Sequence, residues 1–141
     1  DLSETIKANK KLAQEDKKQK QKIQKTIHHL KKMNYIEIDK NGGLNLSAKG
    51  KVRCVLYKSK TMKTKKDSQY FYVVIFDIPE YMRKVRDLFR KVLYNFGSDK
   101  IQKSVFVIES EEGCRLIKEL VRESKIVEYV KIIKCLKMEK I

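Results

Sequence analysis

The residues with the clearest capacity for chemistry are the lysines and side-chain amides of residues 17–33. This stretch holds seven lysines and no acidic residue. Lysine ammonium groups neutralise phosphates, and glutamine can pair with adenine in the major groove of DNA. The composition therefore predicts a surface that contacts DNA, formed by Lys17, Lys18, Gln21, Lys22, Gln24, Lys25, His28 and Lys32. A solvated helix that binds nothing is the competing interpretation.

Three arginines form a second group of candidate residues. Arg83, Arg86 and Arg90 are separated by three and four positions, so they share one side of a helix. Guanidinium groups that point the same way can hold a phosphate, which makes the three candidate phosphate-binding residues. Surface salt bridges, for example with Asp87, explain the same pattern equally well.

Asp77 ends an apolar run and directly precedes Ile78 and Pro79. Because proline favours the first turn of a helix, the Asp77 carboxylate is expected to cap that helix by accepting backbone N–H groups. Metal binding is the second interpretation: one carboxylate is a poor site, but two related by symmetry can share Mg²⁺. No nucleophile paired with a base is visible in the sequence, so no catalytic residue is assigned.

Two helices are expected to position the lysines. The first covers residues 3–14, with Ser3 as its cap and few apolar anchors. The second covers residues 17–33, begins beside Asp16, and has one apolar stripe at helical spacing, which consists of Ile23, Ile27 and Leu30. The lysines lie beside or away from this stripe, so one side of the helix can pack while the other meets an anion.

A short β-hairpin follows at residues 35–46, where alternating apolar residues flank an Asn-Gly-Gly turn. A helix followed by a small hairpin is the ending of a winged helix. Lys40 and Asn41 are then wing residues and are expected near the DNA backbone or minor groove. Ser47 is expected to cap the next helix.

The chain is expected to form two small domains. Residues 59–69 are polar and lack periodicity, which indicates a linker between a domain at 1–58 and a domain at 70–137. The second domain has the order of a split βαβ unit. Its expected elements are a buried strand at 70–76, a helix at 79–95 stopped by Gly97, one long or two short strands at 101–108, a helix at 111–123 and a final strand within 126–136.

The net charge of +16 favours a polyanionic partner. Residues 1–69 carry 19 lysines and arginines against seven acids, so most of the excess lies in the first half. No apolar run is long enough to cross a membrane. Three distant cysteines without a C-x-x-C motif indicate small core residues in a cytoplasmic protein. Because the chain begins with Asp1, we expect that a longer parent was trimmed.

Several segments together resemble a known family. The strand that ends in Phe76-Asp77-Ile78-Pro79-Glu80, the arginine-rich helix, Gly97, and then Gln102-Lys103-Ser104-Val105-Phe106 resemble the central domain of PaaX-type transcriptional repressors. That domain is related to the CRISPR-associated endonuclease Cas2. Residues 27–38 and 46–51 also look like the recognition helix, wing and following helix of such regulators.

The resemblance implies an α+β protein, with an N-terminal winged-helix segment followed by a ferredoxin-like domain that pairs with its twin. It implies a cytoplasmic, homodimeric repressor that binds double-stranded DNA and needs no cofactor, with an effector that the sequence does not identify. It also implies that Asp77 faces its twin across the dimer, where Mg²⁺ can bind. Two alternatives stay open: a Mg²⁺-dependent Cas2-type endonuclease or spacer-acquisition scaffold, and an interaction module that docks on a membrane or an acidic protein.

Overall fold

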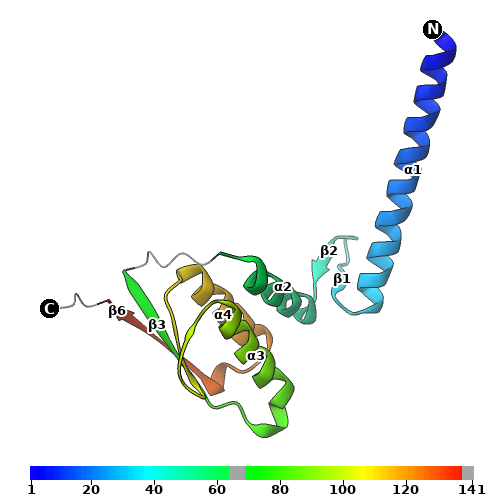
Figure 1. Cartoon of the computed structure of the whole chain (residues 1–141). Coiled ribbons are helices and arrows are strands. Elements are labelled where there is room, and N and C mark those ends of the chain that lie inside the picture. The colour runs from blue at the N-terminus through cyan, green and yellow to red at the C-terminus, as the bar shows by residue number, and fades with distance from the viewer. Residues whose placement is uncertain (64–68, 138–141) are drawn as a thin grey trace. The chain divides into compact units, whose positions relative to one another are not determined.

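The computed structural model describes residues 1–63 and 69–137 and divides into two compact units, Asp1–Ser47 and Ala48–Ile141 (Figure 1). Among the described residues the chain is α+β, with four α-helices, a two-stranded sheet and a four-stranded sheet. No helix of the described part has the length and apolar character needed to cross a membrane.

The first unit is dominated by one long helix, α1 (Leu2–Lys32). Asp1 caps it by accepting a hydrogen bond from the Ser3 backbone N–H, so Ser3 itself is not the cap. The prediction of two separate helices was wrong. No glycine or proline interrupts residues 2–32, so the backbone hydrogen bonds continue through Asp16, which lies inside the helix.

A small hairpin follows α1, as predicted. Asn34 takes a left-handed conformation with φ +59° and reverses the chain after the helix. Strands β1 (Ile36–Ile38) and β2 (Leu44–Leu46) then pair antiparallel. The Ser47 hydroxyl donates to the Asn34 carbonyl oxygen at 2.6 Å, which ties the end of the hairpin back to its beginning.

The second unit is built on a four-stranded antiparallel sheet in the order β4-β5-β3-β6. The predicted buried strand is confirmed as β3, and the extended stretch at 101–108 is resolved into two strands. The strands are β3 (Tyr70–Phe76), β4 (Asp99–Gln102), β5 (Val105–Ile108) and β6 (Val130–Leu136). The central position of β3 explains why its sequence is apolar throughout.

Helices cover one face of this sheet (Figure 1). They are α3 (Arg83–Asn95) and α4 (Glu111–Glu123), and α2 (Ala48–Thr61) packs on both of these helices. Two short 3₁₀ turns, η1 (Glu80–Met82) and η2 (Val127–Tyr129), complete the unit. An aromatic cluster lies between α3 and the sheet. The Phe76 ring is 5.0 Å from the Phe89 ring and 5.9 Å from the Phe106 ring, measured between centroids.

The two faces of the sheet differ sharply in burial. Along β3 the side chains of Tyr72, Val74 and Phe76 are buried beneath the helices. The alternate side chains, Phe71, Val73 and Ile75, point to the opposite face and are half-buried or exposed. Within the described residues no helix covers that second face, which is nevertheless rich in apolar side chains.

The division into units differs from the predicted boundary at residue 58. Helix α2 packs on α3 and α4 and therefore belongs to the second unit. Its Val55 side chain is buried in that core, and the Lys51 ammonium group pairs with Glu123 at 3.2 Å. Of the predicted linker at 59–69, residues 59–61 end α2, and residues 64–68 lie outside the described residues.

The helix predicted at 79–95 begins later than expected. Pro79 precedes the 3₁₀ turn η1, and the α-helix proper starts at Arg83. Gly97, with φ +66°, ends the helical segment as predicted. The helix at 111–123 is confirmed, with the Ser110 hydroxyl accepting a hydrogen bond from the Gly113 backbone N–H.

Candidate nucleic-acid interface

A stripe of lysines runs along the second half of α1. Lys18, Lys22, Lys25 and Lys32 are spaced by four, three and seven positions, which places them on one side of a helix with about 3.6 residues per turn. Ile27 and Leu30, which are half-buried, lie on roughly the opposite side. The predicted packing stripe is shorter than expected, because Ile23 remains 58% exposed.

All seven lysines between residues 17 and 32 are exposed. Among the described residues, none of them lies within 4 Å of a carboxylate, although five lysines and arginines of the second unit form salt bridges. The positive charge of this part of α1 therefore faces solvent. We name the surface formed by Lys17, Lys18, Lys22, Lys25 and Lys32 the lysine stripe.

Polar side chains lie beside the lysine stripe. Gln21, Gln24, Lys25 and His28 line one surface depression on α1. Amide and imidazole groups can donate and accept hydrogen bonds, so they complement lysines, which only donate. Of the predicted DNA-contacting residues on α1, all eight occur within its second half, and the structure brings these four together.

The hairpin turn is organised by one carboxylate. Asp39 Oδ1 accepts the backbone N–H groups of Asn41 and Gly43 at 2.9 and 2.7 Å, and Oδ2 accepts the Asn45 amide at 3.1 Å. These bonds, led by that of Gly43, hold the pKa of Asp39 below its ordinary value. They fix the turn that carries the two exposed wing candidates, Lys40 and Asn41.

The three predicted phosphate-binding arginines have different surroundings on α3. Arg83 is exposed, with its Nε 3.8 Å from Asp87, as the salt-bridge interpretation expected. Arg86 is mostly covered and donates from Nη1 to Glu80 at 2.8 Å. The Arg90 guanidinium lies over the Phe76 ring at 5.7 Å from its centroid.

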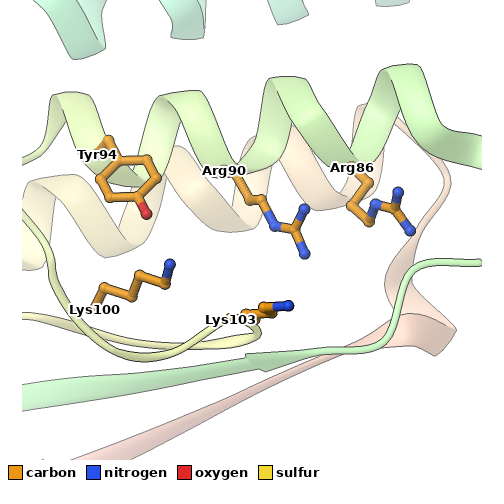
Figure 2. A pocket seen from close by; sticks show the side chains of 5 residues that line it. All are labelled: Arg86, Arg90, Tyr94, Lys100 and Lys103. Carbon is orange, nitrogen blue, oxygen red and sulfur yellow. The ribbon is translucent and has the colours of Figure 1, made fainter.

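Only two of these arginines share a pocket. Arg86 and Arg90 line it together with Tyr94, Lys100 and Lys103, whereas Arg83 does not (Figure 2). The last three residues were not among the predicted phosphate-binding residues. Tyr94 continues the four-residue spacing of Arg86 and Arg90, a signal that was available. Lys100 and Lys103 come from another element, and only the fold brings them to α3.

Asp77 follows β3 and is exposed, and the predicted capping role is wrong. Pro79 precedes η1 and Met82 precedes α3, and neither start has a side-chain cap. The backbone explains this, because the Asp77 N–H donates to the Tyr129 carbonyl and keeps the chain extended past Asp77. The Asp77 side chain instead lines a small cavity of about 280 Å³ with Glu128 and Lys131. Among the described residues, no group of three or more potential metal ligands occurs.

Comparison with known proteins identifies the second half of the chain. A family model described as the PaaX protein central Cas2-like domain matches residues 64–140, more than half of the 141 residues. No curated protein and no solved structure matches the chain. The matched region contains the whole four-stranded sheet, α3 and α4. The chain therefore belongs to the family of proteins that contain the PaaX central Cas2-like domain.

Proposed function

We propose that this protein is a DNA-binding transcriptional regulator of the repressor type. The observation that carries the proposal is the lysine stripe, whose ammonium groups face solvent without carboxylate partners among the described residues. Membership in the PaaX family, a regulator family, is consistent with it. A regulator of this kind acts on cytoplasmic DNA.

In this proposal the second half of α1 is the recognition helix and the β1–β2 hairpin is the wing of a winged-helix segment. The lysine stripe neutralises phosphates, whereas Gln21, Gln24 and His28 reach base edges. The Asp39-bonded turn presents Lys40 and Asn41 to the DNA backbone or minor groove. The rigid turn favours this role, because an ordered wing loses little conformational entropy on binding.

We also propose that the protein is a homodimer that joins through the second unit. The strand order β4-β5-β3-β6 and the β-α-β-β-α-β sequence of elements support a ferredoxin-like domain. Its uncovered sheet face carries apolar residues from three strands that pair in register, with Val73 opposite both Val107 and Ile133. A second copy that covers this face would place two recognition helices on one palindromic site.

A gel-shift titration tests the proposal. The full chain is mixed with random duplex DNA and with fragments of genomic DNA at rising salt concentration. A regulator retains tight binding to a small subset of genomic fragments at salt concentrations that release random DNA. Loss of binding to every fragment at the same salt concentration would mean that the protein binds DNA without sequence preference.

A second candidate function, a Mg²⁺-dependent nuclease of the Cas2 type or a scaffold for spacer acquisition, draws support from Asp77. Its carboxylate is exposed, caps no helix, and lies at the end of the central strand beside Glu128. Two such carboxylates across a dimer axis are able to share a metal ion. Incubation with labelled RNA and DNA, with Mg²⁺ or with EDTA, tests the activity. Cleavage that requires Mg²⁺ and disappears in Asp77→Asn, but not in Asp87→Asn, would favour the nuclease.

A further inference from the structure

We propose that the pocket between α3 and the β4–β5 hairpin binds the phosphate groups of a small molecule, with a diphosphate as the ligand class. This cationic pocket consists of Arg86, Arg90, Tyr94, Lys100 and Lys103 (Figure 2). It lies wholly within the second unit, and the inference does not depend on DNA binding by α1.

The fold builds the pocket from two elements that are separate in sequence. Arg86, Arg90 and Tyr94 repeat every four residues and so line one side of α3. Gly97 then reverses the chain with a positive φ that disfavours other residues. The strand β4 that follows runs back beside β5.

The register of the sheet determines where Lys100 points. Lys100 lies directly opposite Phe106, and residues that pair across two antiparallel strands project from the same face of the sheet. The Phe106 ring is fully buried beneath α3, so Lys100 projects toward the same helix. The register shifts between Lys100 and Gln102, after which Lys103 lies in the turn to β5. Figure 2 shows the lysines below and the arginines above one shared space.

The charge of the cationic pocket is poorly compensated. Four of its five side chains are cations, and Glu80, which binds Arg86, is the one carboxylate within 4 Å of them among the described residues. The Arg86 hydrogen bond and charge hold the pKa of Glu80 below its ordinary value, so Glu80 is ionised at neutral pH. Four cations and one anion leave a net charge of +3, which favours a ligand with several negative charges.

The guanidinium of Arg86 is only partly hydrogen-bonded. Its side chain is only 19% exposed, and Nη1 is occupied by Glu80. Its Nε is buried and has no hydrogen-bond partner in the described part of the chain. A buried donor without a partner is costly, because the group has lost its water without gaining a replacement. The Arg86 guanidinium therefore keeps unmet hydrogen-bonding capacity, and the part of it that lines the pocket would bind an oxyanion by a charge-assisted hydrogen bond.

The size of the cationic pocket favours a small molecule over a nucleic-acid backbone. Its volume of about 440 Å³ lies in the range of small-ligand sites, and its cations converge on one space. Contacts to a nucleic-acid backbone instead follow a row of phosphates, which requires cations along an extended surface. The Tyr94 hydroxyl, which Figure 2 shows directed toward Lys100, adds a neutral donor at the rim.

Isothermal titration calorimetry with the full chain tests the inference. Pyrophosphate and ADP are titrated separately, with adenosine as the uncharged comparison and inorganic phosphate as the singly phosphorylated one. We expect one site per chain for pyrophosphate and ADP, weaker binding of phosphate, and no binding of adenosine. Tighter binding of ADP than of pyrophosphate would show that the adenosine attached to the diphosphate makes further contacts with the protein.

Two variants and one matched control locate the site. Arg90→Gln and Lys100→Gln each remove a charged donor and are expected to weaken ADP binding about tenfold. Lys91→Gln removes the same charge from an exposed position of α3 outside the pocket, and less than a twofold change is expected. If Arg90→Gln disturbs folding because Arg90 packs on the Phe76 ring, Lys100→Gln still tests the site.

Three results would overturn the inference. The first is the absence of binding of both pyrophosphate and ADP at millimolar concentration. The second is equal weakening by Lys91→Gln and Lys100→Gln, which would reduce the effect to diffuse charge. The third is binding of short oligonucleotides that depends on Lys100 while the small ligands do not bind. None of these results bears on the DNA affinity of α1, because substitutions in the lysine stripe measure that affinity separately.

Discussion

The lysine stripe allows a quantitative prediction. The triple variant Lys18→Gln, Lys22→Gln and Lys25→Gln removes three ammonium groups from one side of α1. Glutamine has nearly the same helix propensity as lysine, and all three side chains are exposed, so the fold is expected to persist. The variant therefore isolates the contribution of these charges to DNA binding.

The expected effect follows from counterion release. Each phosphate contact contributes about 0.9 to the slope of log K against log salt concentration on duplex DNA. If each of the three lysines makes one contact, the slope becomes less steep by about 2.7. If the wild type and the variant bind DNA equally at 1 M salt, this difference in slope makes the affinity of the variant about 500-fold lower at 0.1 M salt, or about 4 kcal/mol.

Fluorescence anisotropy provides the assay. A labelled duplex is titrated with the wild-type chain and with the variant at several salt concentrations, and the two slopes are compared. The matched control is the triple variant Lys84→Gln, Lys91→Gln and Lys118→Gln, which removes the same charge from exposed positions of the second unit. The control is expected to change the slope by less than about 0.9, which is the contribution of one phosphate contact.

Equal slopes for the wild type and the stripe variant would refute the assignment of DNA contacts to this surface. A larger loss in the control than in the stripe variant would do the same and would move the DNA-binding surface to the second unit. A reduced slope in both variants to the same extent would show that net charge, not position, determines affinity.

Four further predictions follow from particular contacts. Gly43→Ala places a methyl group 2.5 Å from Asp39 Oδ2, so it should disrupt the hairpin turn, seen as loss of amide protection by NMR, and weaken DNA binding. Ile133→Lys puts a charge on the uncovered sheet face and should convert a dimer to a monomer in analytical ultracentrifugation. Phe106→Ala leaves a cavity in the core and should lower the free energy of unfolding by about 3–5 kcal/mol in urea denaturation. Burial raises the pKa of Cys114, so its thiol stays protonated and should be alkylated by iodoacetamide only at a higher pH than an exposed cysteine.

Each of these predictions has an outcome that contradicts it. Unchanged hairpin protection in Gly43→Ala would mean that the Asp39 carboxylate is not held in the turn. Val127→Lys changes an apolar residue of the η2 turn that is somewhat more exposed than Ile133, and dissociation by this variant alone would place the dimer interface elsewhere. A loss below 1 kcal/mol in Phe106→Ala, or alkylation of Cys114 before the half-buried Cys54, would contradict the packing of the core.

Local sequence patterns predicted most elements of the second unit because the signals there are strong and short in range. The apolar run at 70–76 became β3 and the predicted helix at 111–123 became α4, each with the same bounds, and Gly97 ends its helical segment through its backbone preference. The prediction left one or two strands open at 101–108. The choice depended on the turn at Lys103, which lets β4 pair with β5, and on the pairing of β5 with β3, which lies outside the segment.

The errors in the first unit have a different cause. The predicted break near Asp16 relied on a capping preference that is weak, whereas the uninterrupted helical backbone of α1 is cooperative. The predicted boundary at residue 58 placed α2 in the first domain, because α2 directly follows the hairpin in the sequence. Its apolar side packs on α3 and α4 instead, and burial of Val55 there assigns α2 to the second unit.

The sequence by itself determined the charge of this protein, the lysine stripe and most of the strands and helices of the second unit, because these depend on residue types and spacings within one segment. The tertiary structure alone decided which cations meet. Arg83 was expected beside Arg86 and Arg90, yet Lys100 takes the place in the pocket, since chain reversal at Gly97 and pairing with Phe106 bring it there. Proximity between residues on different elements depends on strand register and on packing, and the spacing of residues within a single helix specifies neither.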